Sequence, residues 1–436
     1  MVNVTVKSID KMQGILMAPA SKSYTQRMLI AAALSDGSGK VVNPLLSEDT
    51  WASFRAVKAL GVQVWEDVDC WRVEGTGELK AAGDLIDVGE SGATLRFMIP
   101  VAALAFGRST FLLSSSLARR PIVPLLSSLK TLNVEAYPEQ IDGFQTIVVE
   151  GKGELLGGKT CISGDVSSQF ISGLMFACPM AKTDTEIQVT TPIESKDYVK
   201  MTQEVLTMHQ IRVQISDDYS HIHIPGRQTF RQVNSSKVPG DFSSAAFLLA
   251  AAAITNSSVK INNLDYKTAQ GDRAILDILK QMGTNEKIYE NSIEVHGVDG
   301  LLKAVDIDAK NIPDLVPICT VLACYADGQS KIFNAQRLKF KESDRLSTIY
   351  KELTKMGASI DMDESSLTIK GPCKLEGATI NSHNDHRIAM ACTVAALKAK
   401  GETTIENAEC IRKSYPSFYN DLASIGAEIS DWKHVR

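Results

Sequence analysis

The amino-acid sequence predicts a mixed α/β (α+β) protein of two domains, built from six repeated βαβαββ units. Three observations support this fold class. The chain has 436 residues, more than one ordinary hydrophobic core holds, because domains of roughly 150 residues are typical. Six apolar, Ala-rich segments recur at a nearly constant interval. Short alternating runs, which favour β-strands, lie between these segments.

The six apolar segments are predicted to be buried helices, because they are apolar nearly all round. The intervals between their first residues are 70, 76, 76, 71 and 72 residues. These first residues are Ser21, Ser91, Ser167, Ser243, Asp314 and His386. A helix start presents unpaired N–H groups and about half a positive charge. Several starts together would attract anions, although Ser or Asp at one start also serves as an ordinary cap.

A second helix is expected in each unit, ending at a residue that mostly favours a left-handed conformation. The six expected ends are Gly61, Asn133, Gln210, Gly283, Gly357 and Gly426. Gly and Asn commonly follow the last residue of a helix. Alternating runs such as 146–149 and 367–369 are typical of strands. Each unit is therefore predicted to contain a strand, a buried helix, a strand, a helix and a strand pair.

Composition excludes several classes of protein. Lys and Arg number 46 and Asp and Glu 51, a net charge of −5, so no basic field favours nucleic acid or an acidic membrane. The eight cysteines form no C-x-x-C pair, which indicates reduced thiols without a metal site. No apolar run reaches the roughly 18 residues of a membrane span, and the first residues lack a signal-peptide profile. A cytoplasmic location is expected.

Two further motifs are interpreted conservatively. Residues 153–160 fit the phosphate-loop pattern G-x-x-x-x-G-K-[ST], but that pattern requires a following helix. Cys161 and Ile162 favour a strand instead, so no phosphate loop is expected. His221 and His223 alternate on a predicted strand. Without a neighbouring carboxylate or cysteine in the sequence, they are interpreted as exposed strand residues rather than metal ligands.

Basic residues gather at one expected helix start. Lys22 and Ser23 lie at the start, and Arg27 lies one turn along, beside Ser23. This group could hold a phosphate or carboxylate by charge-assisted hydrogen bonds. The pair Arg119 and Arg120 lies in a loop, where it either stays solvated or binds an anion.

Charged residues also cluster in the second half of the chain. Lys341 and Arg345 are expected on one helical face with Glu342 beside them, although such a charge run is often simply solvated. Asp314 is either a helix cap or a carboxylate in an apolar cleft, where its pKa could suit a general base. Arg387 lies at a buried helix start, with Asn384 or Asp385 as the cap, and its charge needs a partner.

Nine motifs occur together along the whole chain. They are Ser21-Lys22-Ser23 with Arg27, Gly89-Glu90-Ser91-Gly92 with Arg96, Arg120-Pro121-Ile122, Ser167-Ser168-Gln169-Phe170, Ser195-Lys196 with Tyr198, Ile312-Pro313-Asp314, Lys341-Glu342-Ser343-Asp344-Arg345, Asn384-Asp385-His386-Arg387, and Cys410 with Lys413. This set resembles the 5-enolpyruvylshikimate-3-phosphate synthase family. The resemblance implies a two-domain inside-out α/β barrel with three units and buried parallel helices in each domain. Residues 1–19 and 241–436 would form one domain and 20–240 the other, with hinge crossings near 20 and 240.

The resemblance also implies an activity in the shikimate pathway, which leads to chorismate and the aromatic amino acids. The enolpyruvyl group of phosphoenolpyruvate would pass to the 5-hydroxyl of shikimate 3-phosphate through a tetrahedral intermediate that loses phosphate. The two domains would close around these substrates. No cofactor or metal is implied, since lysines and arginines neutralise the anions. The protein is expected to be a monomer, and members of the family are targets of glyphosate.

The resemblance assigns roles residue by residue. The catalytic residues implied are Asp314, Glu342 and Lys22. Shikimate 3-phosphate would contact Lys22, Ser23, Arg27, Ser167, Ser168, Gln169, Ser195, Asp314 and Lys341. Phosphoenolpyruvate would contact Lys22, Gly92, Arg120, Gln169, Arg345, Arg387 and Lys413.

Four positions depart from the commoner family pattern: Ala93, Phe97, Asp197 and Arg337. The first two put the shape of the phosphoenolpyruvate pocket near Gly92 in question. Two alternative functions are weighed against this one. A UDP-N-acetylglucosamine enolpyruvyl transferase would carry a loop cysteine, where this chain has residues 118–120. An RNA-end-processing protein would carry a basic, aromatic surface, which the net charge disfavours.

Overall fold

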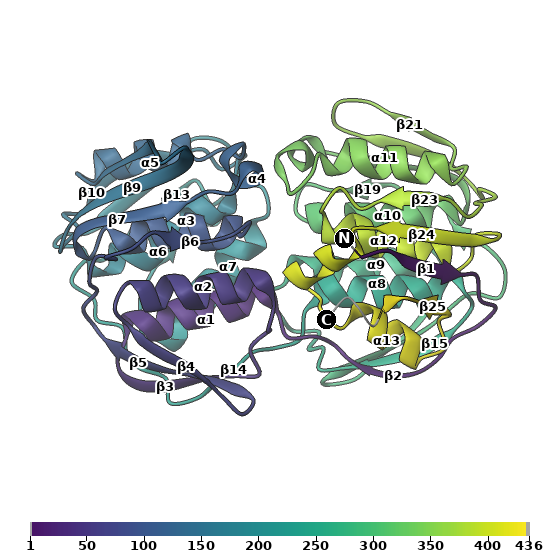
Figure 1. The fold of residues 1–436 in the computed structure, drawn as a ribbon, viewed down its shortest axis with the longest axis horizontal. Helices are drawn as coiled ribbons and strands as arrows, with labels where there is room; N and C mark the ends of the chain where they lie inside the picture. The colour runs from purple at the N-terminus through teal and green to yellow at the C-terminus, as the bar shows by residue number, and fades with distance from the viewer. Residues whose placement is uncertain (1, 433–436) are drawn as a thin grey trace. The chain divides into compact units, whose positions relative to one another are not determined.

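The computed structural model describes residues 2–432 and divides the chain into two compact units (Figure 1). Unit 1 comprises Met1–Pro19 and Pro239–Arg436, and unit 2 comprises Ala20–Val238. Both units mix helices with strands, so the predicted α/β class with two domains is confirmed. The chain passes from one unit to the other after Pro19 and after Val238.

Unit 2 contains seven α-helices and one short 3-10 helix. They are α1 (Lys22–Leu34), α2 (Glu48–Ala59), α3 (Gly92–Ala102), α4 (Ser115–Ala118), α5 (Val123–Thr131), α6 (Ser168–Ala177), η1 (Cys178–Met180) and α7 (Lys196–Met208). Its strands form three four-stranded sheets. In spatial order these are β14 (Ser236–Lys237), β3 (Asp36–Val42), β5 (Cys70–Thr76) and β4 (Gln63–Asp67); β6 (Ile86–Asp87), β7 (Phe106–Leu112), β9 (Phe144–Lys152) and β8 (Glu135–Ile141); and β10 (Gly158–Ile162), β11 (Thr185–Val189), β13 (His221–Ile224) and β12 (Gln214–Ile215).

Unit 1 has the same kinds of element. Its helices are α8 (Phe242–Ile254), η2 (Gly271–Ala274), α9 (Ile275–Gln281), η3 (Pro313–Leu315), α10 (Val316–Cys324), η4 (Gln336–Phe340), α11 (Arg345–Lys355), α12 (His386–Ala396), η5 (Ala408–Lys413) and α13 (Phe418–Ser424). Its sheets are, in spatial order, β16 (Asn285–Ile288), β17 (Ser292–His296), β15 (Ser258–Asn262) and β2 (Gln13–Met17); β18 (Leu302–Lys303) and β19 (Ile307–Asp308) beside β20 (Ala326–Phe333), β22 (Leu367–Gly371) and β21 (Ile360–Met362); and β23 (Thr379–Asn381), β24 (Glu402–Glu406), β1 (Val4–Lys7) and β25 (Ile429–Ser430).

All six sheets share one pairing pattern. A parallel strand pair, such as β6 with β7, is followed by two antiparallel pairings, such as β7 with β9 and β9 with β8. The strand β1 joins the last sheet, where it pairs with β24 and β25. Within residues 2–432 none of these sheets closes into a barrel. The equivalence of the six units as repeats stays a prediction.

The six apolar segments are helices at the centre of each unit. Every residue of α8, α10 and α12 is buried, and these three helices contact one another in the middle of unit 1 (Figure 1). Their Ala-rich sequences explain this position, because a helix that is apolar all round gains most when other elements surround it. Each start therefore lies within its own unit, where side chains of neighbouring elements can reach it.

The expected helix ends are confirmed by the backbone. All six residues adopt a positive φ, as the expected left-handed cap requires. The angles are +87° at Gly61, +63° at Asn133, +60° at Gln210, +100° at Gly283, +95° at Gly357 and +110° at Gly426. The chain thus turns from each second helix into its strand at the predicted point. No helix in the described part of the chain combines the length and hydropathy needed to cross a bilayer.

Candidate active site

Asp314 lies at the centre of a partly buried charge cluster in unit 1. Its Oδ1 accepts hydrogen bonds from Arg345 Nη1 at 2.7 Å and from Lys341 Nζ at 3.1 Å, and its Oδ2 accepts one from Arg387 Nη2 at 3.1 Å. Burial, the largest single effect, raises the pKa of Asp314, but the three cations together lower that pKa well below 3.8. Asp314 is therefore ionised, and it is not the cap of α10, one of the two roles considered for it.

Arg345 connects three carboxylates. Besides Asp314, its guanidinium donates to Glu342 Oε2 at 2.5 Å and to Asp385 Oδ2 at 2.8 Å. Burial lowers the pKa of Arg345, but Asp385, Glu342 and Asp314 outweigh burial and raise it. The side chain is 1% exposed, so these charge-assisted bonds form away from solvent and fix the guanidinium in one orientation.

One detail of the sequence interpretation is wrong. Lys341 and Arg345 were expected on a single helical face, but α11 begins only at Arg345. Asp344 is its N-cap and accepts a bond from Ser347 N at 3.2 Å. Lys341 and Glu342 therefore lie in the connection after η4, where the backbone is not helical, and each reaches the cluster from outside the helix.

Two more cations lie at the start of α12, Arg387 in the helix itself and Lys413 at the end of η5. Asp385 is the N-cap, as one of the two expected residues, and accepts a bond from Arg387 N at 3.0 Å. Lys413, at the end of η5, donates to the carbonyl oxygen of Asn384 at 2.5 Å. Arg387 and Lys413 are both 4% exposed. Unit 1 thus gathers Asp314, Lys341, Glu342, Arg345, Arg387 and Lys413, all assigned from the sequence, around two helix starts.

The predicted start of α1 in unit 2 is confirmed. Ser21 caps the helix by accepting from Tyr24 N, and Lys22 is the first helical residue. Lys22 Nζ forms an ion pair with Asp49 Oδ2 at 2.9 Å, and both side chains are mostly buried. The expected proximity of Ser23 to Arg27 is confirmed as well, because Arg27 Nη1 donates to Ser23 O at 3.0 Å.

Arg27 is buried against α7. Its Nε donates to Thr202 Oγ1 at 2.8 Å and its Nη2 to Tyr198 O at 3.2 Å. The guanidinium also lies 5.0 Å from the ring centroid of Phe97, a distance suited to a cation–π contact. Burial lowers the pKa of Arg27 to about 10, which still leaves it charged at neutral pH.

Two arginines border the start of α3. Arg96 Nη1 donates to Gln169 Oε1 at 2.7 Å. A Cβ added at Gly92 would lie 3.1 Å from Arg120 Nη1 and 3.5 Å from Arg96 Nη1. Gly92 therefore lies beside the guanidinium groups of Arg96 and Arg120, and Gln169 is linked to this group through Arg96.

Besides Ser23, three more assigned serines lie at two other helix starts of unit 2. Ser167 caps α6 by accepting from Gln169 N at 3.3 Å, and Ser168 is the first residue of that helix. Ser195 precedes α7 in a left-handed conformation, with φ of 56°. All three are buried. Hydroxyl groups beside helix N–H groups are well suited to phosphate.

Three residues of these clusters received no functional role from the sequence: Asp49, Arg96 and Asp385. Arg96 carried a signal, since it follows Gly92 by four residues as Arg27 follows Ser23. Asp385 was expected only as a cap. Asp49 belongs to an ordinary helix start, and nothing in the sequence distinguishes it from a surface residue.

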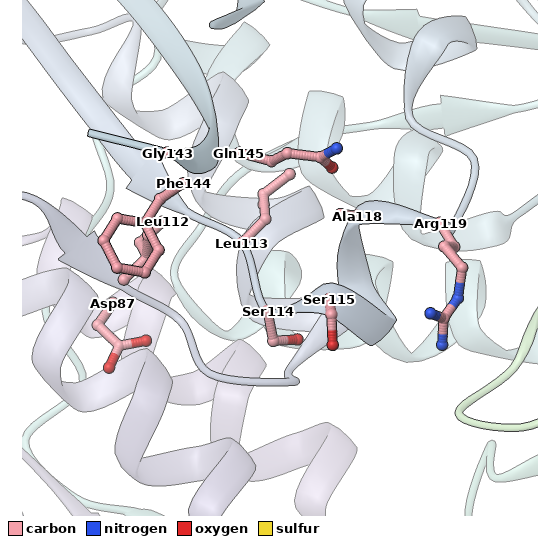
Figure 2. Close-up of a pocket in the computed structure, with 10 residues that line it drawn as sticks. All are labelled: Asp87, Leu112, Leu113, Ser114, Ser115, Ala118, Arg119, Gly143, Phe144 and Gln145. Atoms are coloured by element: carbon pink, nitrogen blue, oxygen red, sulfur yellow. The ribbon is translucent and has the colours of Figure 1, made fainter. Parts of the chain in front are cut away.

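A pocket of about 670 Å³ lies elsewhere in unit 2. Figure 2 shows Arg119 at one end of it and Asp87 and Phe144 at the other. Ser114, the N-cap of α4, and Ser115, its first residue, form one wall. None of its ten lining residues is assigned to a substrate, so the pocket adds nothing to the site. Of the arginine pair, Arg119 borders this pocket, whereas Arg120 is buried beside Gly92.

The two conservative interpretations have different outcomes: the expected strand after residues 153–160 is confirmed, whereas of the two histidines only His221 is exposed and His223 is half-buried. Residues 158–162 form β10 rather than a helix, so no phosphate loop is present there. His221 and His223 lie on β13, and Glu186 of β11 accepts a bond from each, at 2.5 and 2.7 Å. Across residues 2–432, no group of three or more His, Cys, Asp and Glu side chains is arranged to hold a metal ion.

Two mixed α/β units with carboxylates and cations gathered at their helix starts suit an enzyme that acts on small anionic substrates. The chain belongs to the EPSP synthase (3-phosphoshikimate 1-carboxyvinyltransferase) family, whose model matches residues 6–422. The predicted family and enzyme class are thereby confirmed, and the alternatives receive no support.

Curated relatives are similar to this chain over nearly its full length. The 3-phosphoshikimate 1-carboxyvinyltransferase of Methanocaldococcus jannaschii is 41% identical over 97% of this chain and 98% of its own. That of Methanococcoides burtonii is 43% identical over 95% and 96%. Among solved structures, EPSP synthase from Acinetobacter baumannii is similar with a TM-score of 0.82 and 25% identity, covering 99% of this chain and all of the other. The enolpyruvyl transferase NikO from Streptomyces tendae shares the fold, with a TM-score of 0.80 and 17% identity over 98% of each chain.

Proposed function

We propose that this chain transfers the enolpyruvyl group of phosphoenolpyruvate to the 5-hydroxyl of shikimate 3-phosphate, with Asp314 as general base and Glu342 as general acid. One observation carries the assignment of roles. The buried guanidinium of Arg345 holds both carboxylates, at 2.7 Å from Asp314 and 2.5 Å from Glu342. Two carboxylates held at one cation can serve opposite steps of a proton transfer when their surroundings differ.

The first step is an addition. Asp314 takes the proton of the 5-hydroxyl, and the oxygen forms a bond to the central carbon of phosphoenolpyruvate. Glu342 gives a proton to the methylene carbon, which becomes a methyl group. The product of this step is a tetrahedral intermediate that still carries the phosphate.

The second step is an elimination. The ionised Glu342 removes a proton from the methyl group, the carbon–oxygen bond to phosphate breaks, and the enol double bond forms again. The phosphate leaves as hydrogen phosphate, which takes up the proton that Asp314 removed from the 5-hydroxyl, and Lys22 assists by balancing charge and moving this proton. The two steps together consume both substrates and release one phosphate.

Substrate binding depends on the helix starts and cations. Phosphoenolpyruvate contacts Lys22, Gly92, Arg120, Gln169, Arg345, Arg387 and Lys413. Shikimate 3-phosphate contacts Lys22, Ser23, Arg27, Ser167, Ser168, Gln169, Ser195, Asp314 and Lys341. Arg345 and Arg387 contact both Asp314 and the incoming anion. Anion binding therefore weakens the interaction of these cations with Asp314 and raises the pKa of that carboxylate.

Phosphate release tests this function. Mixing the protein with both substrates should release phosphate, and omitting either substrate should prevent release. Release from phosphoenolpyruvate with UDP-N-acetylglucosamine in place of shikimate 3-phosphate would favour the alternative enzyme instead. The monomeric state and cytoplasmic location stay predictions, which size-exclusion chromatography and cell fractionation can test.

A further inference from the structure

Glu352 is a buried carboxylate that the proposed reaction does not use. It lies on α11, seven residues after Arg345, and is 1% exposed. Its Oε2 accepts from Asn381 N at 3.0 Å and from Lys355 Nζ at 2.7 Å, and its Oε1 accepts from His383 Nε2 at 2.9 Å. Burial alone would raise the pKa of Glu352. The hydrogen bonds outweigh burial, so the pKa is lowered. An ionised, buried carboxylate at this point therefore has two partners in one short segment, 381–383.

This segment has an unusual backbone. His383 and Asn384 are consecutive residues with positive φ, 52° and 55°. Left-handed conformations are unfavourable for residues with a Cβ, although Asn and His tolerate them better than most. Two in succession persist only where the surroundings hold them. The bonds from Asn381 N and His383 Nε2 to Glu352 supply such a hold from outside the segment.

The segment also leads directly to assigned residues. Asn384 O accepts the bond from Lys413, and Asp385 caps α12 and binds Arg345. The helix α11 thus contacts the segment at two places, through Arg345 in the first turn of the helix and through Glu352 two turns later. Seven residues advance a helix by about 10 Å, so the two contacts are well separated. They therefore fix the direction of the segment as well as its position.

We infer that Glu352 is a positioning residue for the anion site: with His383 it holds segment 381–385 in its left-handed conformation, and thereby places Arg387 and Lys413 for phosphoenolpyruvate. The inference rests on the proposed function for the identity of the anion. The groups that face Glu352 are Lys355, His383 and Cys392. Lys355 is half-exposed and its ion pair is made with Glu352 rather than with the segment, so it offers a control for the charge of Glu352.

Two measurements on Glu352→Gln test the inference. Gln keeps the shape but cannot accept from both segment donors as a carboxylate does. Amide hydrogen exchange in a peptide covering 381–385 should become faster, and the KM for phosphoenolpyruvate should rise at least about tenfold, the loss expected for a hydrogen bond to a charged group. The KM for shikimate 3-phosphate and kcat should change little. Lys355→Met should leave all of these values near the wild type.

The backbone strain at His383 allows a second, independent test of the inference. Ala at His383 removes the bond to Glu352 and keeps the Cβ penalty, whereas Gly removes both the bond and the penalty. In the Glu352→Gln background, His383→Gly should therefore restore part of the affinity for phosphoenolpyruvate, and His383→Ala should not. If Glu352→Gln does not fold, His383→Ala alone should give the same faster exchange and raised KM.

The outcomes separate the two proposals. Unchanged exchange at 381–385 in folded Glu352→Gln, or an unchanged KM for phosphoenolpyruvate in an active enzyme, would overturn the inference. A loss of kcat without a change in KM would also overturn it, because that result indicates a general structural role. Absence of turnover in the wild type would contradict the proposed function, while the exchange measurement would still decide whether Glu352 holds the segment.

Discussion

Arg387 and Asp314, separated by 73 residues in the chain, meet at 3.1 Å in the interior of unit 1. The pair is one of three cation contacts that keep Asp314 ionised. A base surrounded by cations is weak until an anion competes for them. Phosphoenolpyruvate is such an anion, so substrate binding and activation of the base are one event in the proposed reaction.

Replacing Asp314 with Asn should distinguish its role as a base from its effect on anion binding. Asn cannot take the hydroxyl proton, and turnover should fall at least about a hundredfold, the usual contribution of a general base. Affinity for phosphoenolpyruvate should stay the same or increase, because the three cations lose their competing carboxylate. Phosphate release and isothermal titration with phosphoenolpyruvate measure the two effects. A variant that turns over normally would exclude Asp314 as the base.

Glu342→Gln should affect chemistry and leave binding nearly intact. The amide oxygen can still accept from Arg345, so the local structure should persist. An amide has no carboxylic proton to give, and turnover should be largely abolished. The affinity for shikimate 3-phosphate, measured by titration, should remain close to that of the wild type. Full turnover in this variant would remove Glu342 from the proton-transfer role.

Two glycines should respond differently to Ala. At Gly92 the added Cβ meets the end of the Arg120 side chain at 3.1 Å, and a flexible side chain can yield by a few tenths of an ångström. Gly92→Ala should therefore raise the KM for phosphoenolpyruvate without much loss of stability. At Gly173 the Cβ meets the backbone oxygen of Arg96 at 2.3 Å, so Gly173→Ala should lower Tm. Equal effects of the two changes on KM and Tm would contradict this reading of the site.

Asp272 should make stability depend on pH. Burial and the charge of Asp314 raise the pKa of this carboxyl to about 7, against the opposing effects of Arg387 and a hydrogen bond from Ser243. Between pH 4 and 7 the folded chain thus keeps a proton that the unfolded chain releases. Stability from this group is therefore present at low pH and is lost as pH rises toward 7.

Asp272→Asn removes this titration while preserving the shape of the side chain. The Tm of the wild type should fall relative to that of the variant as pH rises from about 4 to 7, with little further change above that. Thermal unfolding followed by circular dichroism measures the difference. A constant difference in Tm across this range would show that Asp272 does not hold its proton in the folded chain.

Local signals made much of the fold predictable. Apolar helices with polar starts, and Gly or Asn after the second helices, are recorded in neighbouring residues, so the starts at Ser21 and Ser91 and the end at Gly61 follow from the sequence. The non-helical backbone at Lys341 and Glu342 could not be predicted from the sequence. Contacts of these two side chains with Asp314 and Arg345, rather than local helix propensity, determine it.

Partners distant in the sequence were the least predictable part of the site. Lys22 meets Asp49 across 27 residues, and Arg345 meets Asp385 across 40. Such pairs form only when separate elements of the same unit pack against each other, and the sequence around Asp49 resembles any capped helix. The family motifs supplied Lys22 and Arg345 with roles, but the carboxylates that hold these two cations in place come from the structure.

Running the reaction in D2O tests the central claim most directly. Addition and elimination turn the methylene carbon into a methyl group and back, so the account predicts deuterium in the methylene group of the product, detectable by mass spectrometry or NMR. Glu342→Gln should show neither product nor labelled phosphoenolpyruvate. Formation of product and phosphate by the wild type without any deuterium at that carbon would contradict the proposed proton transfers.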